Sequence, residues 1–200
     1  MTRYTILLSR TKRTFPRMRV VKRKDSKFIR ALFWPLKLFG VKGSEYATTI
    51  GSTIYVPDDF DERSATSQYR MLRHEKVHVR QFHMWPIPVR WLWPINHVLM
   101  GFCYLFVLPT LLTMRSYFEK QAYTQTLVSM WEDGDLPQHG WPGVATWLAE
   151  VFGGSQYLWM STRGKGHLWA LTTLKNIAFG RITSAAEDHI ELGGEHNAWY

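Results

Sequence analysis

Residues 74 to 78 have the pattern His-Glu-x-x-His, which brings two metal-ligating side chains and one acid together in a short stretch. On an α-helix, residues four apart lie on one face, so the imidazoles of His74 and His78 can reach the same metal ion. Glu75 can then accept a proton from a water molecule that the metal makes more acidic. The pattern predicts a zinc site for hydrolysis, with Glu75 as general base. The alternative is a pair of core histidines satisfied by hydrogen bonds.

A catalytic zinc site needs a third protein ligand and an open fourth position. His83 is a poor candidate, because five residues after His78 place it about 140° further around the helix. We expect a structural or surface role for it. The next acidic residue along the chain is Glu119, within the segment FEKQAY. Glu119 is therefore the predicted third ligand, unless it is an exposed helix residue paired with Lys120 or Arg115.

Helices and one short β segment are predicted to position these residues. The helix with the motif is capped by Asp61 or Ser64 and ends before Pro86. Upstream, SEYATTIGSTIYVPDDF is rich in strand-forming residues, which indicates a strand or short hairpin over 46–56. Further helices are expected over residues 115–131, 144–161 (with a break at Gly153-Gly154) and 166–180. These elements indicate a mostly helical α+β fold, with a single domain over residues 41–200.

HEKVHVRQ, followed downstream by FEKQAY and preceded by TIGSTIYVP, resembles the small gluzincin-like zinc metallopeptidases found in bacteria and tailed phages. The resemblance covers residues 46–160. It implies a zincin-like core in which a short β-sheet or hairpin packs on the HExxH helix. It also implies that zinc is bound by His74, His78 and Glu119, and that Glu75 is the general base.

The same resemblance implies that an extended peptide is held by backbone hydrogen bonds along the strand Tyr46–Val56. The motif does not specify which residue stabilises the oxyanion of the reaction. Tyr123, Tyr157 and His167 are the candidates, and the sequence does not choose among them. The only cysteine, Cys103, excludes an internal disulfide and a cysteine-rich zinc knuckle, so a metal must rely on histidine and carboxylate.

The positive charge is concentrated at the N-terminus. Residues 1–40 contain twelve Lys or Arg and one acid, Asp25, whereas the whole chain has a net charge of +9. We expect a basic N-terminal arm over 1–40 that ends in an amphipathic segment, Phe28 to Phe39. Residues 1–30 of such an arm are suited to nucleic acid or a neighbouring subunit, and the apolar segment to a membrane surface. A solvated tail is the alternative.

Residues 91–114 form an uncharged segment, and this segment is long enough for a membrane span. A single span would be about 36 Å long and would separate Glu119 from His74 and His78. We therefore favour a buried, kinked helix. The N-terminus lacks the apolar stretch of a standard signal peptide, so the expected location is the cytoplasm, or for a phage-encoded chain the host cytoplasm or the virion.

These features favour a zinc-dependent peptide-bond hydrolase that acts on a peptide or protein substrate. The alternative is a non-catalytic structural or assembly protein, such as a component of a phage particle. That protein would keep the zincin fold and use its basic arm to bind nucleic acid or a neighbouring subunit.

Overall fold

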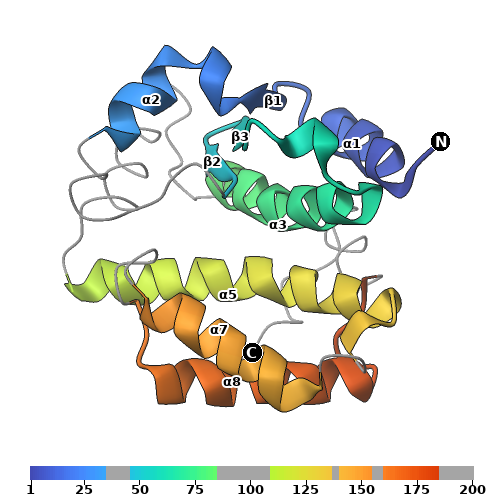
Figure 1. Ribbon diagram of the computed structural model, residues 1–200, viewed down its shortest axis with the longest axis vertical. Coiled ribbons are helices and arrows are strands. Elements are labelled where there is room, and N and C mark those ends of the chain that lie inside the picture. Colours follow the sequence, from blue (N-terminus) through green and yellow to red (C-terminus); the bar gives the residue numbers. More distant parts are fainter. Residues whose placement is uncertain (35–45, 85–108, 137–139, 155–159, 185–200) are drawn as a thin grey trace.

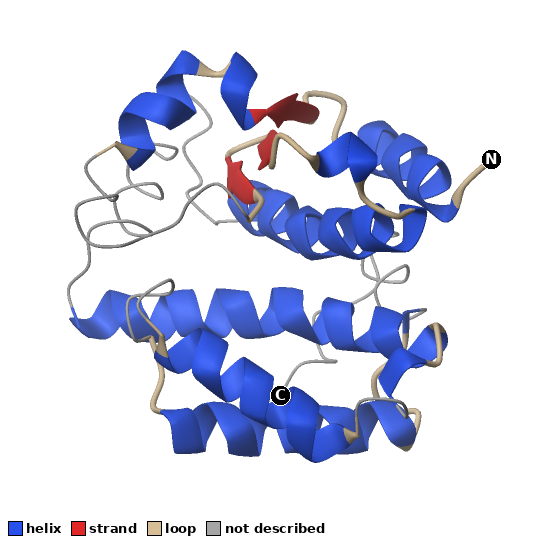
Figure 2. Cartoon of the chain, viewed as in Figure 1, coloured by secondary structure: helices blue, strands red, loops and turns tan. Residues whose placement is uncertain are grey.

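The computed structural model describes residues 1–34, 46–84, 109–136, 140–154 and 160–184, and these form two halves (Figure 1). The first half contains a small sheet with helices beside it, and the second half is helical (Figure 2). The mostly helical α+β class expected from the sequence is confirmed. The helices are α1 (Arg3–Thr14), α2 (Lys27–Phe33), α3 (Ala65–Met84), α5 (Pro109–Glu132), α7 (Trp141–Gly153) and α8 (Arg163–Ala178), with short 3-10 turns η1 (Arg23–Asp25) and η3 (Phe60–Glu62).

The sheet has three strands in the order β1-β3-β2. β2 (Thr48–Ile50) and β3 (Thr53–Val56) are antiparallel, and the turn between them contains Gly51 with φ 60°, a left-handed conformation that favours glycine. The expected strand or hairpin over 46–56 is thus a hairpin. β1 (Arg19–Lys22) pairs with β3 in parallel, so the strand that leads into the motif helix lies in the middle of the sheet.

The described part of the basic N-terminal segment is folded onto the domain and does not extend away from it. α1 packs against α3, and β1 is a strand of the sheet. Met18 is 3% exposed in a core with Ile54 and Leu72, and apolar side chains of α1 pack against this core. Apolar residues lie between the cations of this segment, and they pack on the core while most of the cations stay exposed.

The motif helix α3 lies in the first half, on the side that faces α5 of the second half (Figure 1). Of the two predicted caps, Ser64 is the one observed: its Oγ accepts a hydrogen bond from the Ser67 backbone N–H at 3.2 Å. α3 packs against α1 and the sheet on one side and against α5 on the other. A second apolar core, formed by α5, α7 and α8 around Leu127, Leu148 and Leu174, lies beyond α5.

The uncharged segment 91–114 lies largely outside the described residues, since only its last part belongs to α5. Within the part of the chain that the structure describes, no helix is both long and apolar enough to cross a membrane.

Candidate metal centre

α3 and α5 run antiparallel, and hydrogen bonds and ion pairs between their side chains set their alignment. Near the start of α3, Arg70 pairs with Asp133 (2.7 Å) just beyond the end of α5. Near the end of α3, the Gln81 side-chain amide donates to the Phe118 carbonyl (3.2 Å) in the first half of α5. Between these two contacts, Arg73 donates to Gln125 Oε1 (3.0 Å). This alignment places the two histidines of α3 opposite Glu119 and Thr126 of α5.

His74, His78 and Glu119 come together at the boundary between the helices. Glu119 Oε2 lies 3.7 Å from Nε2 of each histidine. One ligand atom from each of the three residues lies within 4.8 Å of the other two, which is close enough to hold a metal ion. His78 and Glu119 are buried, whereas the His74 side chain is 13% exposed. Residues from two helices, with Glu119 about forty positions after His78, thus form one compact donor set.

Hydrogen bonds determine which nitrogen of His78 can bind a metal. Gln81 donates its amide N–H groups to the Phe118 carbonyl oxygen and to Gln121 Oε1 (2.9 Å), so its own Oε1 must act as an acceptor. That oxygen lies 2.9 Å from His78 Nδ1. Nδ1 therefore carries a proton, and in the neutral ring Nε2 has the free lone pair, directed to the same space as Glu119.

A residue of α5 orients the imidazole of His74 in the same way. Its Nδ1 lies 3.2 Å from Thr126 Oγ1, and the Thr126 hydroxyl donates its proton to the Ala122 carbonyl. The hydroxyl oxygen is then free to accept from Nδ1–H, which leaves Nε2 available as a ligand. The ring of Tyr123 stacks edge-on against His74 at 4.7 Å between centroids. The imidazole is thus held by a hydrogen bond and by packing.

The charges of the cluster depend on one another. Burial alone would lower the pKa of His78, but Glu119 outweighs it through charge and hydrogen bonding, with smaller contributions from Glu75 and Gln81, and the pKa rises to about 9. Burial acts to raise the pKa of Glu119, whereas His78 and His74 together hold it well below its usual value. Without a metal, the site therefore contains an imidazolium beside a carboxylate at neutral pH.

Glu75 is fixed beside this cluster by the sheet. Its side chain is buried, and Oε2 accepts a hydrogen bond from Thr49 Oγ1 of β2 at 2.7 Å. The neighbouring residue Thr48 accepts a hydrogen bond from the buried Arg23 at 2.7 Å. Burial lowers the pKa of Arg23 overall, and the negative charge of Glu75 acts in the opposite direction. The N-terminal segment and the hairpin together hold the acid in place.

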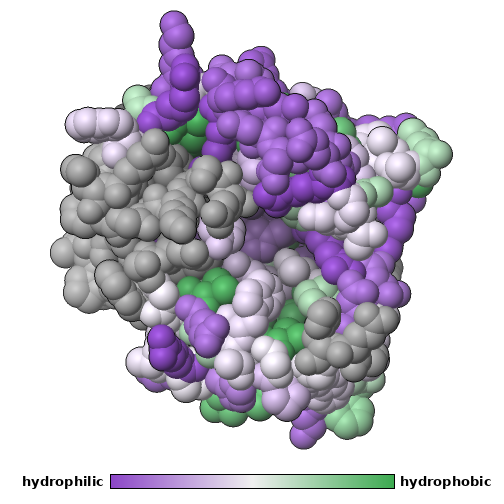
Figure 3. All heavy atoms as spheres, viewed as in Figure 1, coloured by the Kyte–Doolittle hydropathy of each residue, from purple (hydrophilic) through white to green (hydrophobic). Residues whose placement is uncertain are grey.

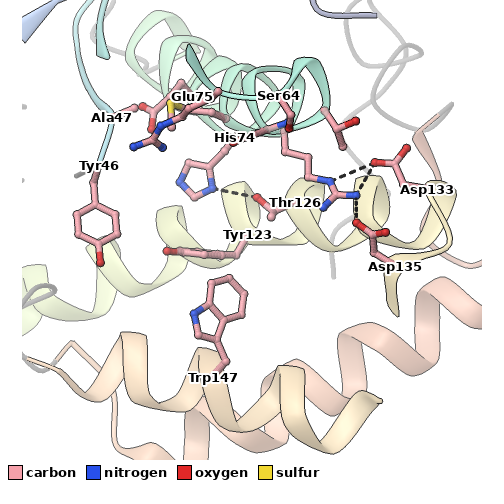
Figure 4. Close-up of a pocket in the computed structure, with 15 residues that line it drawn as sticks. Tyr46, Ala47, Ser64, His74, Glu75, Tyr123, Thr126, Asp133, Asp135 and Trp147 are labelled. Atoms are coloured by element: carbon pink, nitrogen blue, oxygen red, sulfur yellow. Dashed lines mark hydrogen bonds and ion pairs between the residues drawn. The ribbon is translucent and has the colours of Figure 1, made fainter. Parts of the chain in front are cut away.

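A cleft of about 810 Å³ opens onto His74 and Glu75. The surface is hollowed between the two halves of the protein, and polar residues lie at the base of the hollow (Figure 3). In Figure 4, His74 and Glu75 project from α3, Tyr123 and Thr126 from α5, and Trp147 from α7. One end of the cleft is bordered by Tyr46 and Ala47, which lead into β2, and the other by Arg70 with its carboxylate partners Asp133 and Asp135.

His83 and the candidate oxyanion donors differ in their distance from the cluster. His83 lies apart from the cluster, where Nδ1 bonds to the Val79 carbonyl (2.8 Å) and Nε2 to Ser52 Oγ (3.3 Å). Tyr123 lines the cleft, whereas His167, on α8, is not among the residues around it. Tyr157 lies outside the described residues.

No role was predicted for three supporting residues, Thr49, Gln81 and Thr126. Gln81 is the last residue of HEKVHVRQ and Thr49 the first of TIGSTIYVP, so both lie in stretches that carry the resemblance. Gln81 follows His78 by three residues and shares its helix face, which is a local signal of contact. The contacts of Thr49 and Thr126 are tertiary, and no local pattern predicts them.

Comparisons with protein-family models, with curated proteins and with solved structures return no match for this chain. The resemblance to gluzincin-like metallopeptidases therefore depends on the motif residues themselves. What the structure adds is the His74, His78 and Glu119 group at metal-binding distance.

Proposed function

We propose that the protein is a zinc-dependent hydrolase of peptide bonds, a metallopeptidase that uses His74, His78 and Glu119 as metal ligands. The observation that carries the proposal is the approach of Glu119 Oε2 to both histidine Nε2 atoms at 3.7 Å. Two imidazoles and one carboxylate are a donor set that catalytic zinc sites use, with the fourth position left for water or substrate.

The geometry of the three donors suits an ion of this size. With zinc–ligand bonds of about 2.0–2.1 Å, two donors of a tetrahedral site lie about 3.4 Å apart. The two separations between Glu119 and the histidines, 3.7 Å each, exceed this by a few tenths of an ångström, and all three donor atoms lie within 4.8 Å of one another. Side-chain rotations would bring the three donors closer together around an ion. Zinc held there would supply a Lewis acid that polarises a peptide carbonyl and acidifies water.

Glu75 would provide the acid–base chemistry. Its carboxylate takes a proton from water as the water oxygen attacks the carbonyl carbon. It then delivers that proton to the amide nitrogen as the C–N bond breaks, which yields a carboxylic acid and an amine. The hydrogen bond from Thr49 leaves Oε1 of Glu75 as the more accessible oxygen for this transfer. Tyr123, the candidate donor that lines the cleft, would stabilise the oxyanion.

The sheet would hold the substrate. β3 has a partner on each side, so among the described strands β2 has one unpaired edge. Tyr46 and Ala47, which precede β2, line the cleft close to Glu75 (Figure 4). An extended peptide could add to this edge through backbone hydrogen bonds and bring its scissile bond to Glu75.

The test combines metal analysis with a search for cleavage. We expect one zinc per chain by elemental analysis of the purified protein, and loss of that zinc in His74→Ala. Cleavage of a mixed peptide library, followed by mass spectrometry, should depend on zinc. Glu75→Gln should retain the metal and abolish cleavage, because it cannot accept the proton.

Glu150→Gln provides the matched control, since Glu150 is exposed on α7 and is not part of the cleft. It should retain both zinc and activity. Zinc well below one equivalent in the unchanged protein, or full activity in Glu75→Gln, would contradict the proposal.

A further inference from the structure

The short helix α2 lies at an outer corner of the molecule (Figure 1), and two of its aromatic side chains are exposed to solvent. Phe28 is 58% exposed and Trp34, which ends the helix, is 70% exposed. The helix is anchored by Ile29, which is 1% exposed, and its first turn is capped by the Ser26 hydroxyl. Because Ile29 fixes one face to the body of the protein, the opposite face must point outward.

Cations share that outward face with the aromatic residues. Lys27, Ala31 and Trp34 follow one another at spacings of four and three residues and therefore lie in one row, with Phe28 and Arg30 on either side of it. All five are exposed. Neither Lys27 nor Arg30 has an ion-pair partner among the described residues. Trp34 thus lies between Arg30 and Lys27 around the helix, and Phe28 lies on the other side of Lys27.

We propose that this face of α2 binds the surface of an anionic phospholipid membrane. Trp and Phe side chains are suited to the boundary between headgroups and acyl chains, and neighbouring Lys and Arg side chains pair with lipid phosphates. Residues 1–34 hold eleven Lys or Arg against one acid, so a negative surface attracts this part of the protein over a longer range. Such binding would attach the protein to a membrane surface through α2.

The shape of the face favours a membrane over a nucleic acid. Single-stranded nucleic acids are bound in positively charged grooves, where successive bases stack on aromatic side chains. The α2 face is instead part of a single helix at the periphery of the molecule (Figure 1), and its aromatic residues Phe28 and Trp34 are exposed. A single exposed helix face of this kind can lie against the surface of a bilayer.

The test is sedimentation of the full chain with extruded vesicles. One set contains phosphatidylcholine alone, and the other contains about 30% phosphatidylglycerol. We expect binding to the anionic vesicles only, weakened as sodium chloride rises from about 0.1 to 0.5 M because salt screens the attraction. Lys27→Gln with Arg30→Gln should weaken binding about thirtyfold, since each cation near such a surface contributes on the order of fivefold. Phe28→Ser with Trp34→Ser should weaken it at least about tenfold.

The matched control lies on α8, at the other end of the molecule. Leu168 and Phe179 are 67% and 66% exposed, so Leu168→Ser with Phe179→Ser removes as much exposed apolar surface and should leave vesicle binding unchanged. Circular dichroism and thermal unfolding verify that each variant is folded. Equal loss in the α8 and α2 variants, equal binding to neutral vesicles, or no binding to vesicles would overturn the proposal. So would binding of an oligothymidylate that only the α2 variants lose.

Discussion

Binding of zinc to the His74, His78 and Glu119 cluster should release a proton and tighten as pH rises. The reason is that His78, with a pKa raised to about 9, is protonated at neutral pH in the metal-free protein. A metal binds only the neutral imidazole, so this proton must leave. Glu119 contributes no proton over this range, because its pKa is held well below its ordinary value and it is already ionised.

The size of the effect follows from the distance between the working pH and this pKa. At pH 7, about two units below the pKa, about 1% of the molecules have a neutral His78, so the apparent affinity is about a hundredfold, or about 2.7 kcal/mol, below its limiting value. The affinity should rise about tenfold per pH unit between pH 7 and 9 and then level off. Close to one proton should leave per zinc bound at pH 7.5.

Calorimetric titrations in buffers with different ionisation enthalpies measure the number of protons released, and competition with a chelator gives the affinity at each pH. An independent check is a proton NMR titration of the metal-free protein. Glu119→Gln removes the main influence that raises the pKa of His78, so burial should bring that pKa down toward or below 6.5. An affinity that is flat from pH 7 to 9, or a His78 pKa that Glu119→Gln leaves unchanged, would refute this account of the cluster.

Further predictions concern the residues around the site and the core behind it. Gln81→Leu should weaken zinc binding about 10- to 100-fold, because it removes the acceptor that orients His78. Gln68→Leu on the same helix is the control and should not change the zinc affinity measured by chelator competition. Thr49→Val should retain zinc but lower the turnover of any peptide substrate about tenfold or more, because Glu75 loses its hydrogen bond. An equal loss of zinc would instead indicate a structural defect. Leu148→Ala, in the core between α7 and α8, should lower the free energy of unfolding by about 2–5 kcal/mol in urea, against about 0.5 kcal/mol or less for the exposed Leu168→Ala.

The parts of the fold that could be predicted are those with local patterns. The α3 helix follows from the spacing of its apolar residues and from Ser64 before it, and the hairpin follows from strand-forming residues around Gly51. Glu119 could be selected because no other acid lies between it and His78. Each of these features needs information from one stretch of chain, where periodicity and capping are strong signals.

The N-terminal segment shows why the rest could not be predicted. Its cations are obvious in the sequence, but the short strand β1 has only four residues and pairs in parallel with β3 more than thirty positions downstream. No local pattern specifies such a non-local pairing. The charge count locates the cations along the chain, whereas the packing of Met18 and α1 on the sheet depends on contacts that only the folded chain defines.

The parallel pairing of β1 with β3 has a consequence for how this chain can be shortened or recombined. A protein trimmed to residues 41–200 would retain every predicted ligand and the general base. It would nevertheless lose one edge of its sheet, the helix that covers α3, and Arg23, whose side chain holds Thr48 beside the Thr49 that fixes Glu75. The exposed edge of β3 would invite pairing with other chains. The stretch that looks most dispensable is therefore one that the HExxH helix needs to keep Glu75 in its observed position.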